Sequence, residues 1–134
     1  MGKYSFGKTG PTFEGVSLVP AFNSITTTAT PATGSCAVQF VFKDVNGATV
    51  TAPVSGLLYL SEVATGLTND LADTTLAVLT NGALKNLGSA GPSMFTTTAA
   101  GLLGLTITAA ADDYYVVFVK PDGSLLISPV CTVS

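Results

Sequence analysis

Histidine, arginine and tryptophan are all absent from this sequence of 134 residues. Without histidine, the chain lacks the usual base of a serine or cysteine hydrolase and the commonest zinc ligand. Without arginine, it lacks the bidentate group that clamps phosphates and carboxylates. Eight acidic residues outnumber five lysines, so the chain cannot form the basic face that nucleic-acid affinity requires. These absences argue against an enzyme and against a nucleic-acid-binding protein.

Charge of either sign is also scarce. Charged residues make up 10% of the chain, against about one-quarter in an average soluble domain. Serine and threonine take their place, most densely in the threonine runs at 26–28 and 96–98. We expect that these hydroxyl groups keep the surface hydrated, or that partners cover much of it.

The sequence lacks long apolar runs. No stretch reaches the roughly 18 apolar residues of a membrane span. No apolar segment follows Lys3 and Lys8, as one would in a secretory signal. We therefore expect a chain that is made and folded in a cytoplasm and that does not bind a membrane.

Motifs that carry chemistry are missing as well. Neither a phosphate-binding glycine loop nor a nucleophile elbow is present. Asn69, Asp70 and Asp73 offer oxygen ligands for calcium, but without the spacing of a calcium loop, and they suit the first turn of a short helix equally well. The adjacent Asp112 and Asp113 would point to opposite faces of a strand, which predicts a solvated strand entry. We predict no catalytic residue, no metal and no cofactor.

What the sequence does contain is a series of strand patterns separated by turn signals. Val38, Phe40 and Phe42 alternate with more polar residues, which is typical of a half-buried strand. Further strands are expected at 56–61, 94–98, 103–108, 114–119, 125–128 and 130–133.

The segment 56–61 is apolar on both faces, and 114–119 is the strongest strand, central and buried on both faces. Asn46-Gly47 and residues 120–124 are typical of tight turns, and Pro129 indicates a bulge or an edge. Residues 69–86 fit either a helical turn or pieces of strand. The short strands and the lack of helical periodicity predict an all-β fold, an immunoglobulin-like antiparallel β-sandwich over residues 35–134.

Residues 1–34 read differently, because they show neither strand nor helix periodicity. We predict an extended N-terminal arm in which Tyr4, Phe6, Phe13 and Phe22 are single aromatic anchors for pockets on a partner. The alternative is that the arm folds back on its own sandwich and adds an edge strand.

Cys36 and Cys131 leave three alternatives open. They are buried reduced thiols, or they form an internal disulfide between the first and last strands, or they form a bridge to a neighbouring subunit. An internal bridge without strain would stabilise the fold by roughly 4–5 kcal/mol in the chain-entropy model.

Residues 38–128 carry a recognisable succession of motifs. A hydrophobic strand closes with Leu60-Ser61-Glu62-Val63-Ala64-Thr65-Gly66, a threonine-rich strand spans 101–108, and an aromatic strand with a proline–glycine turn spans 115–123. In these features the sequence resembles the small immunoglobulin-like structural proteins of tailed-bacteriophage virions, which include head-decoration (cement), head-fibre and tail-associated proteins.

The resemblance implies a non-enzymatic virion structural protein on the capsid exterior. Its expected partners are the major capsid protein, neighbouring virion subunits and further copies of the same chain. The leading hypothesis is a capsid decoration protein that binds the shell through its N-terminal arm and stabilises it. The alternative is an immunoglobulin-like recognition module that binds a host glycan or surface protein.

Overall fold

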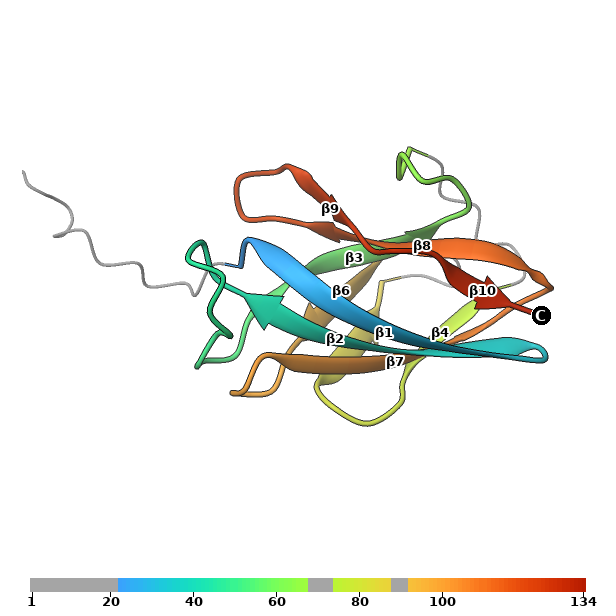
Figure 1. Ribbon diagram of the computed structural model, residues 1–134, viewed down its shortest axis with the longest axis horizontal. Helices are drawn as coiled ribbons and strands as arrows, with labels where there is room; N and C mark the ends of the chain where they lie inside the picture. Colours follow the sequence, from blue (N-terminus) through green and yellow to red (C-terminus); the bar gives the residue numbers. More distant parts are fainter. Residues whose placement is uncertain (1–21, 68–73, 88–91) are drawn as a thin grey trace, which may run out of the picture.

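The computed structural model describes residues 22–67, 74–87 and 92–134, and within these ranges the chain forms strands and loops but no helix. Two antiparallel sheets face each other as a β-sandwich (Figure 1). The strands are β1 (Ser24–Ala32), β2 (Ser35–Lys43), β3 (Ser55–Ser61), β4 (Thr75–Val78), β5 (Ala83–Asn86), β6 (Ser93–Thr96), β7 (Leu102–Thr108), β8 (Asp112–Val119), β9 (Leu125–Ile127) and β10 (Cys131–Val133).

The first sheet has the strand order β1-β2-β7-β4, and the second has the order β10-β8-β3-β6-β5, with β9 also paired to β8. The chain therefore crosses between the sheets several times. One crossing joins β4 to β5 within the stretch whose structure the sequence left open. Gly82 makes this crossing with a φ of +88°, and a Cβ at this position would lie 2.6 Å from the carbonyl oxygen of Thr96. Only glycine fits such a close approach at that backbone angle.

The core lies between the sheets and follows the alternation expected from the sequence. In β2, Val38, Phe40 and Phe42 have no exposed surface, whereas the residues between them are half-buried. The ring of Phe42 packs against Phe95 and Phe118, with centroid distances of 5.4 and 5.1 Å. The two faces of β8 are also largely covered, since Val116, Val117 and Phe118 are fully buried. The prediction of a central strand at 114–119 is confirmed.

The turns predicted from glycine and its neighbours are present. Gly47 has a φ of +79°, and Asp44 Oδ1 accepts hydrogen bonds from the backbone N–H groups of Asn46 and Ala48. Gly123 has a φ of +86° in the turn at 120–124 between β8 and β9. Both glycines hold the left-handed conformation that the predicted turns need.

Pro129 interrupts the last part of the chain, as the sequence indicated. β9 pairs with residues 117–119 of β8 and β10 pairs with residues 112–114, so the two short strands lie along the same strand. Between them, Ser128 replaces part of the ladder: its Oγ accepts a hydrogen bond from the N–H of Val116 at 2.9 Å. The hydroxyl of Ser128 in turn donates to the carbonyl of Pro129 at 2.8 Å.

The predicted boundary of the arm at residue 34 is wrong. Residues 24–32 form β1, which pairs with β2 along its full length from Ser24↔Lys43 to Ala32↔Ser35. Phe22 is not an exposed anchor: it is 4% exposed and packs edge-on against Phe42 at 5.1 Å. The strand was missed because threonine, serine, alanine and proline fill all of it except Ile25, so no apolar alternation was visible. From Phe22 onward, the alternative of folding back to add an edge strand is the correct one.

Candidate functional site

The aromatic residues proposed as anchors do not form a single group. Phe22 belongs to the core, while Tyr4, Phe6 and Phe13 lie outside the described residues. Phe22 sits where the chain enters the sandwich, and the N–H of Asn23 donates to the carbonyl of Lys43 at 2.8 Å. The described part of the chain therefore starts at the end of the sandwich at which β1 begins and β2 ends.

The two cysteines, far apart in sequence, meet in the core. Cys36 in β2 and Cys131 in β10 come from different sheets, have no exposed surface and are free thiols that interact with each other. Burial raises the pKa of both thiols, that of Cys131 to about 11. Both are therefore protonated at neutral pH, which makes them poor nucleophiles. An internal bridge needs only a local approach of two neighbouring sulfur atoms, whereas a bridge to another subunit requires opening of the core.

Of the acidic positions considered in the sequence, Asp112 and Asp113 lie within the described residues. Asp112 and Asp113 are exposed at the start of β8, where Asp113 Oδ1 accepts a hydrogen bond from the hydroxyl of Thr132 at 2.8 Å. Asn69, Asp70 and Asp73 lie outside the described residues. Across the described ranges, no three His, Cys, Asp or Glu side chains come together in a way that could hold a metal ion. Nor do the described residues include a helix long and apolar enough to cross a membrane.

The outer face of the first sheet is uncharged over most of its area and carries mainly small or polar side chains, apart from the half-buried pair Val41 and Leu102. One line of partners across its four strands reads Thr30, Ala37, Thr106 and Ala77. The next line contains Thr28, Gln39 and Gly104. This face keeps its contact with water through hydroxyl and amide groups, as the scarcity of charge led us to expect.

The outer face of the second sheet has the opposite character, because apolar side chains line up across its strands in two parallel rows. The first, which we call the apolar row, runs through Met94 in β6, Leu57 in β3, Val119 in β8 and Leu125 in β9. The second, the covered row, runs through Tyr59, Val117 and Ile127.

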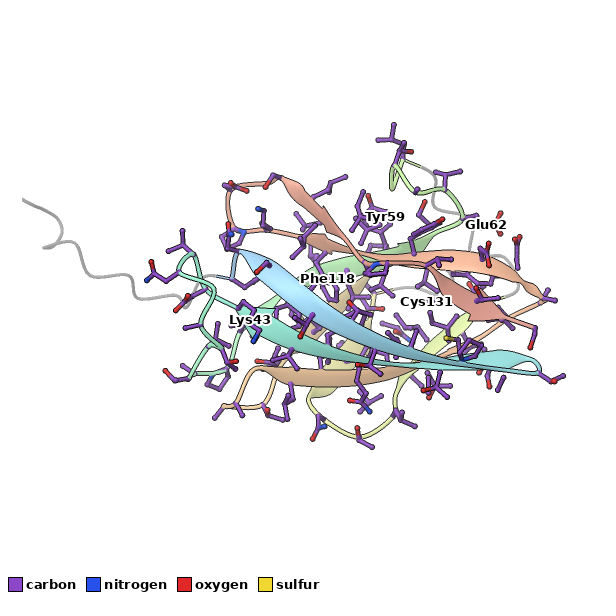
Figure 2. The ribbon with its side chains drawn as sticks, in the orientation of Figure 1. Lys43, Tyr59, Glu62, Phe118 and Cys131 are labelled. Atoms are coloured by element: carbon purple, nitrogen blue, oxygen red, sulfur yellow. The ribbon has the colours of Figure 1, made fainter. Side chains whose placement is uncertain are left out.

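A loop folds over the covered row and closes it. The hydroxyl of Tyr59 donates to the carbonyl of Gly66 at 2.7 Å, and Gly66, with a φ of +71°, packs on Val117 and Ile127. Figure 2 shows Tyr59 of β3 on the outer side of the sandwich, whereas Phe118 of β8 points between the sheets. Glu62, also labelled there, is the first residue of the covering loop. The loop follows β3 and forms the later part, residues 62–66, of the Leu60–Gly66 motif noted in the sequence, and its structural role is to cover this row.

The apolar row has no such cover among the described residues. Leu57 is 39% exposed, Met94 49% and Leu125 39%, and Val119 is half-buried. Sequence reasoning did not identify this surface. The one available signal was the observation that residues 56–61 are apolar on both faces, which a single strand in a sandwich does not require.

Comparison of this chain with models of protein families, with curated proteins and with solved structures found no match.

Proposed function

We propose that this chain is a non-enzymatic structural protein of a bacteriophage virion, a decoration protein bound to the outside of the capsid. The observation that supports this best is the combination of a well-packed β-sandwich with an N-terminal sequence, residues 1–21, that carries Tyr4, Phe6 and Phe13 and joins the sandwich at Phe22. The proposal assigns attachment to residues 1–21 and gives the sandwich the role of an external body.

The strand order supports an immunoglobulin-like classification of that body. In immunoglobulin constant-type domains, strands A, B, E and D form one sheet, and C, F and G form the other. The order β1-β2-β7-β4 corresponds to A-B-E-D, and β3, β8 and the β9/β10 pair correspond to C, F and G. β5 and β6 extend the second sheet beyond strand C.

The attaching segment is shorter than the sequence suggested, and this changes how the proposal is tested. Deletion of residues 1–34 would remove β1 and Phe22, so a loss of binding would reflect an incomplete fold. Deletion of residues 1–21 leaves Phe22 and all ten strands in place. In the proposed mode, Tyr4, Phe6 and Phe13 fill pockets on the major capsid protein.

The test compares the full chain with two variants on empty capsids of the phage that encodes it, prepared without this protein. One variant lacks residues 1–21, and the other carries Tyr4→Ser, Phe6→Ser and Phe13→Ser in an otherwise complete chain. We expect the full chain to saturate the capsids and both variants to lose most of their binding while keeping the wild-type circular dichroism spectrum. Saturation by the truncated chain would refute attachment through the arm. Competable binding of the sandwich to a glycan array, without capsid binding, would favour the recognition-module alternative.

A further inference from the structure

We propose that the apolar row on the outer face of the second sheet binds the same row of a second copy of this chain, forming a two-fold symmetric dimer. This inference rests on the geometry of the sandwich and does not depend on the proposed function. It assigns a partner to a surface that the fold leaves uncovered among its described residues.

The row is contiguous because the strand registers align it. Met94 pairs with Leu57, Leu57 with Val119, and Val119 with Leu125, so the four side chains stand on one face of four adjacent strands. Lys85 of β5 pairs with Met94 and continues the line at one end. Five strands at about 4.8 Å spacing make a line roughly 19 Å long.

The contrast with the neighbouring row argues that this exposure is a distinct feature. The fold covers Tyr59, Val117 and Ile127 with a loop held by a hydrogen bond and by a glycine at positive φ. The apolar row lies two residues away along each strand, on the same face. It stays open, and three of its side chains are 39–49% exposed. The outer face of the first sheet, by contrast, carries mainly threonine and small residues, and its apolar pair Val41 and Leu102 is half-buried. A contiguous apolar surface of this kind on one face marks an interaction site.

The charges at the two ends of the row favour a second copy as the occupant. Lys85 is exposed at the β5 end, and Asp122 is exposed in the turn beside Leu125 at the opposite end. Lys120 in the same turn is half-buried and interacts with Asp122, so Asp122 is the more exposed charge at that end. A two-fold axis near Leu57, at the middle of the line, brings Lys85 of each copy toward Asp122 of the other. An isologous interface requires this kind of self-complementarity.

The test is sedimentation equilibrium of the full chain from micromolar to millimolar concentration, with five variants. Leu57→Lys places a charge at the proposed axis in both copies, and we expect it to raise the dimer dissociation constant by about a hundredfold or more. The matched control, Thr28→Lys, adds the same charge to the outer face of the first sheet and should leave the constant unchanged. Circular dichroism melts confirm that each variant is folded.

Charge exchange supplies a second test that leaves the apolar row intact. Lys85→Glu and Asp122→Lys should each weaken the dimer by about fivefold, because each creates two like-charge contacts per dimer. The double variant should restore wild-type affinity, since both contacts are then re-formed with their signs reversed. A wild-type chain that stays monomeric throughout, a dimer insensitive to Leu57→Lys, or a double variant weaker than either single one would each overturn the proposal. Capsid binding by residues 1–21 is measured separately, so failure of one proposal is distinguishable from failure of the other.

Discussion

Replacing Phe22 by alanine tests whether the described fold begins at this residue. The side chain is 4% exposed, and its ring lies 5.1 Å from that of Phe42 and 6.1 Å from that of Phe95, both edge-on. Removing a fully buried phenylalanine side chain costs about 3–5 kcal/mol. Because Phe22 stands at the start of the described fold, where the chain can relax, we expect a loss near the lower end, about 3 kcal/mol.

The measurement is urea denaturation followed by far-ultraviolet circular dichroism, with a thermal melt as a second probe. For a domain of this size, about 3 kcal/mol corresponds to a fall in Tm of roughly 10 °C. Phe13→Ala is the matched control, because it removes the same ring from a residue that precedes Phe22, and it should leave both midpoints unchanged. If Phe22→Ala unfolds at the wild-type midpoint, Phe22 is not part of the core and the assignment of residues 22–34 to the sandwich is wrong.

Three further substitutions test the loop, the interrupted strand and the cysteine pair. Gly66→Ala places a Cβ within 3.2 Å of Val117 and Ile127 at a positive φ. We expect the free energy of unfolding in urea to fall by about 1–3 kcal/mol. A stability equal to that of the wild type would contradict the described loop. Ser128→Ala leaves the buried N–H of Val116 without its 2.9 Å acceptor, so stability should fall by about 1–3 kcal/mol and the Val116 amide should exchange faster with deuterium. Burial raises the pKa of Cys131 from 9.0 to about 11, so the unfolded chain releases this proton at lower pH than the folded one. The resulting stability is complete below pH 9 and is lost between pH 9 and about 11, by on the order of 3 kcal/mol. Cys131→Ala should reduce the fall in stability over this pH range, and the smaller fall that stays belongs to the buried thiol of Cys36, whose pKa is also raised. A wild-type profile that is already flat there would show that the thiols are not desolvated.

The parts of the fold that the sequence predicts are those in which local chemistry determines local structure. The alternation of Val38, Phe40 and Phe42, the turn glycines Gly47 and Gly123, and the break at Pro129 each depend on a few neighbouring residues. Strand β1 was missed because threonine suits an exposed and a half-buried position equally well, so it left no pattern. An isolated aromatic such as Phe22 looks the same in the sequence whether it faces its own core or a partner.

The candidate surface could not be predicted, because it depends on the register of strands from distant parts of the chain. Met94, Leu57, Val119 and Leu125 stand in one row only once four strands have paired in their particular order. Which row is exposed depends further on the loop that Gly66 closes. The meeting of Cys36 and Cys131 likewise required the last strand to be placed against β2.

The interruption of the last strand by Ser128 and Pro129 bears on how the protein behaves when many copies are crowded together. Beside it runs the uncharged strand segment Tyr114 to Val119, whose composition is that of a fibril-forming segment. A continuous outer strand beside it would present an unbroken ladder to which another chain could add. Instead, β9 and β10 are three residues each, and proline supplies no donor between them. The break thus protects against cross-β aggregation along this edge, even when copies of the chain are concentrated.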